Sequence, residues 1–286
     1  MILPMKKFKF ILLIISFLPT LFFAKSISLQ EEAFAFGNGE LAILEFEKDS
    51  IDKLLDNNRS LRFVAHPTND KMKIVFYPIS YYKTSNINLE MLVKDSKFPL
   101  ALNVKPKEYK KEILKVEASK ATPSEEISKR IKAESEEAGK IYSTVTNQRY
   151  WDSPFVFPME SEITSGYGNA RVFNDVVKSY HAGTDFRAPI GSSVYSTNRG
   201  KVVLAKDRYL AGLSVVLDHG EGIYSCYFHL SQTDLQVGDI VEKGELIGLS
   251  GNSGRVTGPH LHFSIVINGT AVNAVHAIGA INALFN

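Results

Sequence analysis

Cysteine is nearly absent from this sequence, because Cys226 is the only one among 286 residues. A single cysteine cannot form an internal disulfide, so each folded domain must be held together by its hydrophobic core. Cys226 lies in the run Ile223-Tyr-Ser-Cys-Tyr-Phe, whose composition is typical of a strand. We interpret Cys226 as a small buried side chain rather than as a nucleophile.

An excess of one charge is also lacking, since the formal net charge is only +2. Residues 151–286 hold nine Lys and Arg against twelve Asp and Glu, which gives this part a net charge of −3. Proteins that bind nucleic acids usually carry a concentrated basic face. We therefore expect no nucleic-acid partner.

Long hydrophobic runs are missing after residue 28. Before it, three lysines precede an apolar run over Phe10–Phe23, and the small-x-small pattern Ala24-Lys25-Ser26 follows. This order predicts a secretory signal peptide over residues 1–26, with cleavage after Ser26. The alternative is a retained anchor, but the run falls short of the ~20 residues that cross a bilayer. We expect secretion across the inner membrane and no transmembrane segment after cleavage.

Residues 29–116 are predicted to form a β-rich domain that resembles a small sandwich, because short apolar runs alternate with turn residues. The expected strands are Ala33–Phe36, Leu41–Phe46, Leu61–Ala65, Met72–Tyr77, Asn88–Val93 and Leu100–Val104.

Residues 117–150 are predicted to form a helical connector. Thr122 can cap the helix, Pro123 suits its first position, and Glu125 can bond back to the cap. An apolar stripe follows at helical spacing, and we expect it to dock the helix. It consists of Ile127, Ile131, Ala138 and Ile141.

Residues 151–286 return to a β pattern that is rich in glycine, so the expected fold is mainly β, with antiparallel sheets or a sandwich in this domain. The expected strands are Ser193–Thr197, Lys201–Lys206, Ser214–Asp218, Ile223–Leu230, Ile240–Glu242, Leu246–Ser250 and Leu261–Asn268.

Histidines concentrate in this last domain, which holds six of the seven. His181 and Asp185 form an HxxxD motif, and His260 and His262 form an HxH motif, with His229 between them in sequence. Residues i and i+2 of a strand share one face, so His260 and His262 are expected side by side. Two histidines and a carboxylate suit a catalytic zinc ion with one open position, and a further histidine can act on the substrate. The spacing alone does not decide whether His260 or His262 is the ligand.

Residues 160–273 resemble the M23 family of metallopeptidases, of the lysostaphin type. The similarity is carried by Tyr180-His-Ala-Gly-Thr-Asp-Phe-Arg-Ala-Pro, Tyr227-Phe-His-Leu-Ser and Ser250-Gly-Asn-Ser-Gly-Arg-Val-Thr-Gly-Pro-His-Leu-His-Phe, among others. The segment before it is similar, through Tyr109…Ile113-Leu and Trp151-Asp-Ser-Pro-Phe, to the accessory β-domain and helix of Gram-negative secreted members.

The resemblance implies a role for each motif residue. His181, Asp185 and His262 would be the ligands of one Zn²⁺ ion, while His229 and His260 would be catalytic histidines that do not bind the metal. Ser264 stands where many members have Glu, on the same strand face as His260 and His262. A contact to a ligand, or the substrate preference, is therefore expected to differ here.

The implied function is a metallopeptidase that hydrolyses peptidoglycan cross-links, of the D-alanyl–diaminopimelate kind, or stem peptides, in the periplasm of a Gram-negative cell. Endopeptidase and carboxypeptidase specificity both stay open. The alternative is a non-catalytic regulator of other wall hydrolases. Residues 29–116 are a candidate surface for cell-wall protein partners. Either these residues or the helical connector is a candidate cover for the metal site. Tyr167, Tyr195 and Tyr227 are candidates for substrate contact, whereas His219 and His276 are expected to be structural.

Overall fold

The computed structural model describes residues 35–114, 123–173 and 176–286. The expected signal peptide over residues 1–26 and the expected cap residue Thr122 lie outside these ranges. Within the described ranges, no helix has both the length and the apolar character needed to cross a membrane.

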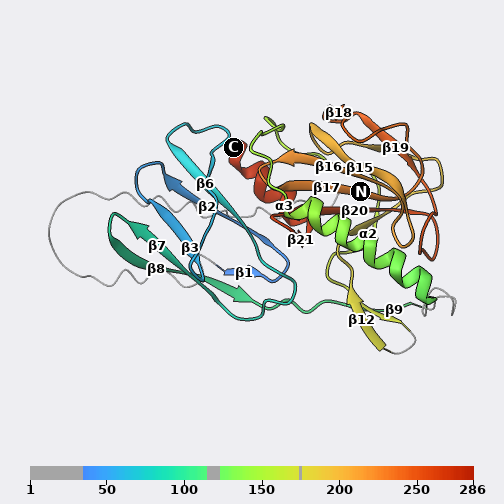
Figure 1. Cartoon of the computed structure of the whole chain (residues 1–286), viewed down its shortest axis with the longest axis horizontal. Coiled ribbons are helices and arrows are strands. Elements are labelled where there is room, and N and C mark those ends of the chain that lie inside the picture. Colours follow the sequence, from blue (N-terminus) through green and yellow to red (C-terminus); the bar gives the residue numbers. More distant parts are fainter. Residues whose placement is uncertain (1–34, 115–122, 174–175) are drawn as a thin grey trace.

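The strands before residue 106 form two sheets that face each other around one apolar core, as the sandwich prediction requires (Figure 1). The core contains Phe46 and Val75 from one sheet and Leu54, Leu89 and Leu102 from the other. One sheet has the order β1-β8-β7-β3-β4 and the other β2-β6-β5. Their bounds are β1 Ala35–Gly37, β2 Leu41–Glu47, β3 Lys53–Asp56, β4 Arg59–Ser60, β5 Val64–Ala65, β6 Met72–Pro78, β7 Ile87–Val93 and β8 Ser96–Lys105.

The C-terminal part is built on a ten-stranded sheet whose main path runs β10-β13-β20-β17-β16-β15-β18. Strand β14 pairs with β19, β19 with β17, and β21 with β20. The bounds are β10 Ile163–Ser165, β13 Thr184–Arg187, β14 Ser193–Tyr195, β15 Gly200–Arg208, β16 Gly212–Gly220, β17 Ile223–Gln232, β18 Ile240–Val241, β19 Leu246–Ser250, β20 His260–Ile267 and β21 Thr270–Val272.

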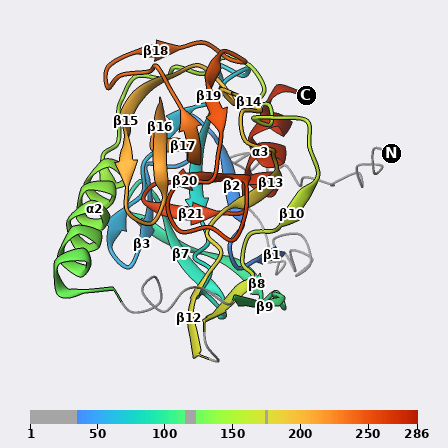
Figure 2. The same cartoon turned by 90° about the vertical axis from the view of Figure 1, so that its right-hand side faces the viewer.

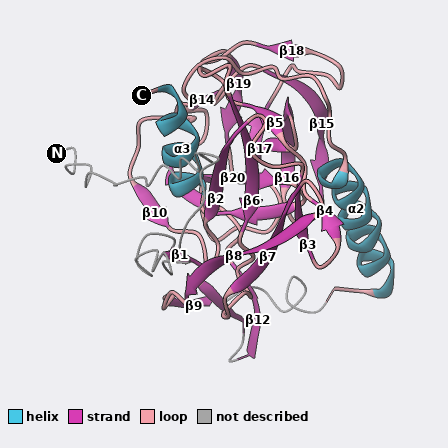
Figure 3. Cartoon of the chain, turned by 90° about the vertical axis from the view of Figure 1, so that its left-hand side faces the viewer, coloured by secondary structure: helices cyan, strands magenta, loops and turns pink. Residues whose placement is uncertain are grey.

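The two faces of this sheet are covered differently, because successive side chains of β20 point to opposite sides. Leu261 and Phe263 join a large core that includes helix α3 (Ala274–Asn282). Val266 joins a smaller core that Ile141 and Tyr142 of helix α2 (Glu125–Ser143) complete. Figures 2 and 3 show the two helices on opposite sides of the sheet. His260, His262 and Ser264 share the face of Val266, so the candidate site lies on the α2 side.

Helix α2 begins later than the sequence indicates. Its N-cap is Ser124 rather than Thr122, and the Ser124 side chain accepts a hydrogen bond from the Ile127 N–H. Pro123 therefore precedes the cap instead of opening the helix. Ser124 is the better choice because the Ser hydroxyl, one residue before Glu125, reaches the free N–H groups of the first turn.

The prediction for Cys226 is confirmed. Its side chain lies in the smaller core, with its Sγ atom 3.3 Å from the Tyr142 hydroxyl. Burial raises the pKa of the Cys226 thiol to about 12. The neutral thiol is inert under ordinary conditions.

The N-terminal sandwich packs against the α3 side of the large sheet. Leu41, Ile74 and Phe76 belong to the same core as Trp151 and α3. Helix α3, which the sequence analysis did not predict, is capped by Asn273 and ends before a short 3₁₀ helix, Ala283–Phe285. The sandwich residues of this core therefore lie on the α3 side of the sheet, whereas His262 lies on the α2 side.

A third, small sheet also joins the N-terminal part to the C-terminal part. Strand β9 (Lys111–Leu114), which follows the sandwich, pairs in parallel with β11 (Ala170–Phe173), and β11 pairs with β12 (Val176–Tyr180). Figure 1 shows β9 and β12 below the large sheet. The last residue of β12, Tyr180, leads directly into His181.

Candidate metal centre

Three side chains converge on the α2 side of the sheet. His181 follows β12, Asp185 lies on β13, and His262 lies opposite Asp185 on β20. His181 Nε2 is 2.9 Å from Asp185 Oδ1 and 3.0 Å from His262 Nδ1, and His262 Nδ1 is 2.9 Å from Asp185 Oδ1. The strand register thus brings together the three predicted ligands, which are all buried.

The chemistry of these atoms fits a cation. The other ring nitrogen of His181, Nδ1, lies 2.9 Å from the Gly166 carbonyl and 3.0 Å from Ser165 Oγ. A carbonyl only accepts hydrogen bonds, so Nδ1 carries the proton and Nε2 presents a lone pair. That lone pair faces a carboxylate oxygen and a second imidazole nitrogen. Their separations suit one ion whose bonds to N and O are about 2.0–2.1 Å long.

His262 is held in the opposite sense. Its Nε2 lies 2.9 Å from Ser264 Oγ, so the serine hydroxyl can accept a hydrogen bond from Nε2–H and leave the Nδ1 lone pair for a metal. Ser264, which stands where many family members have Glu, thus contacts a candidate ligand. Gly183 leaves room for it, because a Cβ atom there would stand 2.5 Å from both His262 Nε2 and Ser264 Oγ.

Asp185 is ionised in this setting. Burial raises the pKa of its carboxyl group, but the contacts with His181 and His262 outweigh burial and hold that pKa well below its usual range. A buried carboxylate beside two imidazoles supplies the negative charge that favours a divalent cation.

His229 and His260 lie next to this group. Their ring centroids are 4.9 Å apart, and the centroid of His229 is 6.0 Å from that of His262. His229 Nδ1 is 2.8 Å from the Ser253 carbonyl, and His260 Nδ1 is 2.8 Å from the Gly258 carbonyl. Both residues therefore carry a proton on Nδ1, and in the neutral tautomer the lone pair lies on Nε2.

The charge state of His229 is set by its surroundings. Burial, together with the nearby His262 and His260, lowers the pKa of His229 to about 3. His260 Nε2 lies 3.8 Å from Asp185 Oδ1. The structure thus brings all five predicted site residues into one cluster and leaves His229 uncharged near neutral pH.

Comparisons with known proteins agree with this cluster. The model of peptidase family M23 matches residues 179–274, which include all five site residues. This part of the chain is a peptidase M23 domain.

Two relatives come from Vibrio cholerae, and both carry the name peptidoglycan DD-endopeptidase. ShyA is 42% identical over 125 residues, which are 42% of this chain and 29% of ShyA. ShyB is 37% identical over 146 residues, which are 49% of this chain and 34% of ShyB. The chain thus matches about a third of the length of these curated relatives or less.

A crystal structure described as that of an M23 peptidase from Pseudomonas aeruginosa shares the overall fold. Its TM-score is 0.64 at 23% identity, over 84% of this chain and 94% of that chain. The superimposed part is longer than the M23 domain, so the similarity in fold includes strands of the N-terminal region.

The remaining candidates lie away from the M23 centre. His219 is buried, with Nδ1 2.8 Å from the Arg199 carbonyl and Nε2 2.7 Å from Ser225 Oγ, which supports its structural role. Tyr167 and Tyr227 are buried, and the Tyr227 hydroxyl accepts a hydrogen bond from Thr197 N–H. Tyr227 belongs to the large core, and the Tyr167 hydroxyl donates to the Ala271 carbonyl, so neither side chain offers an exposed surface to a substrate in this structure.

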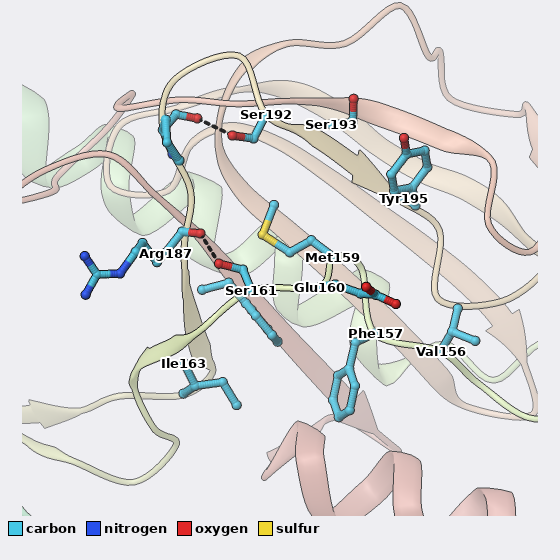
Figure 4. Close-up of a pocket in the computed structure, with 12 residues that line it drawn as sticks. Val156, Phe157, Met159, Glu160, Ser161, Ile163, Arg187, Ser192, Ser193 and Tyr195 are labelled. Carbon is cyan, nitrogen blue, oxygen red and sulfur yellow. Dashed lines mark hydrogen bonds between the residues drawn. The ribbon is translucent and has the colours of Figure 1, made fainter. Parts of the chain in front are cut away.

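A cavity of about 1020 Å³ lies at the edge of the M23 sheet (Figure 4). Phe157, Met159, Ile163 and Tyr195 are among its lining residues, and none of the five site residues lines it. It borders the metal centre only through Phe186 and Arg187, which follow Asp185 on β13.

Sequence reasoning missed the groups that fix the histidine tautomers. These are the carbonyls of Gly166, Ser253 and Gly258. Every residue has a carbonyl, so no residue type signals this role. Only the path of each loop decides which carbonyl reaches a ring nitrogen.

Proposed function

We propose that this chain is a zinc metallopeptidase that hydrolyses peptide cross-links of peptidoglycan. The observation that carries the proposal is the convergence of three possible ligand atoms, from His181, Asp185 and His262, beside two further histidines. The names of the Vibrio relatives supply the substrate class. Peptidoglycan lies outside the cytoplasmic membrane, so we also propose that the protein acts there, in the periplasm.

His181, Asp185 and His262 would hold the ion. When bound, zinc lowers the pKa of a ligated water to about 7 and polarises the carbonyl of the scissile bond. His229 and His260 do not belong to the ligand set. Each donates a hydrogen bond from Nδ1–H to a carbonyl, so each can accept a hydrogen bond from a water molecule at Nε2 and orient that water for attack.

The test is digestion of purified muropeptides by the zinc-loaded protein, followed by mass spectrometry. Cross-linked dimers joined from D-alanine to diaminopimelate and uncross-linked pentapeptides serve as parallel substrates. Conversion of dimers to monomers supports the endopeptidase. Loss of terminal D-alanine alone would identify a carboxypeptidase. If neither substrate changes while added wall amidases become more active, the chain is a regulator instead.

A further inference from the structure

Helix α2 lies outside the residues that the family model matches, yet it forms hydrogen bonds with a turn beside the metal centre. The carboxylate of Glu134 accepts a hydrogen bond from the Tyr209 N–H, at 3.2 and 2.9 Å from its two oxygens. Arg130 Nε donates to Glu134 Oε1 at 2.7 Å and fixes this carboxylate. The Glu134 side chain is only 12% exposed, so the contact is shielded from water.

Further contacts attach the same turn, residues 207–212, to the helix. Arg130 also donates to Asp207, and Arg208 Nη2 donates to the Glu134 carbonyl at 3.1 Å. Figure 2 shows α2 beside β15, the strand that leads into the turn. Among these contacts, only the Glu134 carboxylate receives a main-chain N–H of the turn itself. It therefore fixes the backbone rather than a flexible side chain.

The same turn also forms a hydrogen bond with the backbone of His229. The Ala211 carbonyl accepts the His229 N–H at 2.9 Å, and the Leu210 carbonyl accepts the Arg255 N–H at 2.9 Å. His229 has a φ of 62°, a left-handed conformation that a residue with a side chain keeps only when its surroundings hold it. The Ala211 carbonyl and the Ser253 carbonyl are two of the contacts that do so.

We propose that Glu134 is a positioning residue for His229. Glu134 fixes the N–H of Tyr209, the neighbouring carbonyl of Ala211 fixes the backbone of His229, and the imidazole then meets the substrate in one orientation. This inference rests on the proposed function for the role of His229. The three metal-binding residues sit on or beside β12, β13 and β20 rather than on the turn, so the zinc site itself does not depend on Glu134.

The experiment compares Glu134→Ala, Glu134→Gln and the wild-type full-length chain. Gln keeps an oxygen that accepts the Tyr209 N–H, so it should rescue the Ala variant. Glu136→Ala is the matched control, because Glu136 is 61% exposed on the same helix and only approaches Lys132, at 3.9 Å. Three readouts are taken: kcat and KM on muropeptide dimers, zinc affinity against a competing chelator, and amide hydrogen exchange of peptides covering residues 207–213 and 227–231.

We expect Glu134→Ala to exchange faster in both peptides and to lose about tenfold in kcat, because a misplaced catalytic group is costly. The KM and the zinc affinity of Glu134→Ala should stay close to those of wild type. The Glu134→Gln and Glu136→Ala variants should resemble wild type in all three readouts. The proposal is overturned if Glu134→Ala and Glu136→Ala exchange alike, or if exchange rises while kcat does not change. A wild type that is inert with zinc bound refutes the proposed function instead, and the exchange comparison still decides whether Glu134 orders His229.

Discussion

Ser264 Oγ lies 2.9 Å from His262 Nε2, the ring nitrogen that does not face Asp185. Ser264, which stands where many family members have Glu, thus has a contact with a candidate metal ligand. The hydroxyl can accept a hydrogen bond from Nε2–H of His262, and in that arrangement the Nδ1 lone pair is left for a metal.

Replacing Ser264 with Ala should weaken zinc binding by about tenfold, since partners that orient a metal-binding histidine are typically worth 10–100-fold in affinity. The measurement is zinc affinity by competition with a chelator of known strength. Ser231→Ala is the control, because the Ser231 hydroxyl donates to the Leu249 and Ser250 carbonyls instead. Equal zinc affinity in the Ser264→Ala variant and wild type would show that the serine does not fix His262.

A methyl group at residue 183 should disturb the same pair. The Cβ atom of Gly183→Ala would come within 2.5 Å of both His262 Nε2 and Ser264 Oγ, far inside van der Waals contact. We expect the imidazole to move and zinc affinity to fall by at least about tenfold. Gly166→Ala provides the control, because a Cβ there meets nothing within 4 Å and the Gly166 carbonyl is kept. Normal zinc binding by Gly183→Ala would contradict the geometry.

His219 should make the stability of the metal-free protein depend on pH. Burial lowers the pKa of His219 to about 4, whereas an unfolded histidine has a pKa of about 6.5. Below about pH 6.5 the unfolded chain therefore takes up a proton that the folded chain does not bind. The free energy of unfolding must fall as pH falls from about 6.5 to about 4, by at most about 1.4 kcal/mol per pH unit.

Urea unfolding at several pH values in this window measures that slope. His219→Gln also loses contacts to Arg199 and Ser225, so its absolute stability is lower and only the slope is compared. The slope should be shallower in the variant than in wild type. Parallel slopes would mean that His219 already carries its proton in the folded protein.

The sequence predicted many of the strands that have a clear apolar pattern. Leu246–Ser250 matches β19, and Met72–Tyr77 matches β6 to within one residue. Strand β13 was missed because Thr184-Asp-Phe-Arg has only one apolar residue, since its other face serves the metal centre. Helix α3 was missed as well. Asn273, whose side chain accepts the His276 N–H, is the cap signal that could have revealed it.

The site was predictable in a different way. The five residues follow from motifs and from resemblance, because metal chemistry restricts which residue types can stand there. The choice of His262 over His260 needed the resemblance. In the structure, His262 Nδ1 lies 2.9 Å from Asp185 Oδ1, whereas His260 Nε2 is 3.8 Å away. The link from Glu134 to His229 had no sequence signal, because it passes through main-chain groups of Tyr209 and Ala211 that are far from both residues along the chain.

The most direct test of the account measures zinc content and dimer cleavage on the same samples of wild type, His181→Ala and His229→Ala. We predict one zinc per chain and cleavage for wild type, loss of both for His181→Ala, and zinc without cleavage for His229→Ala. Cleavage by His181→Ala, or none by zinc-loaded wild type, would contradict the claim that this centre is a peptidase site.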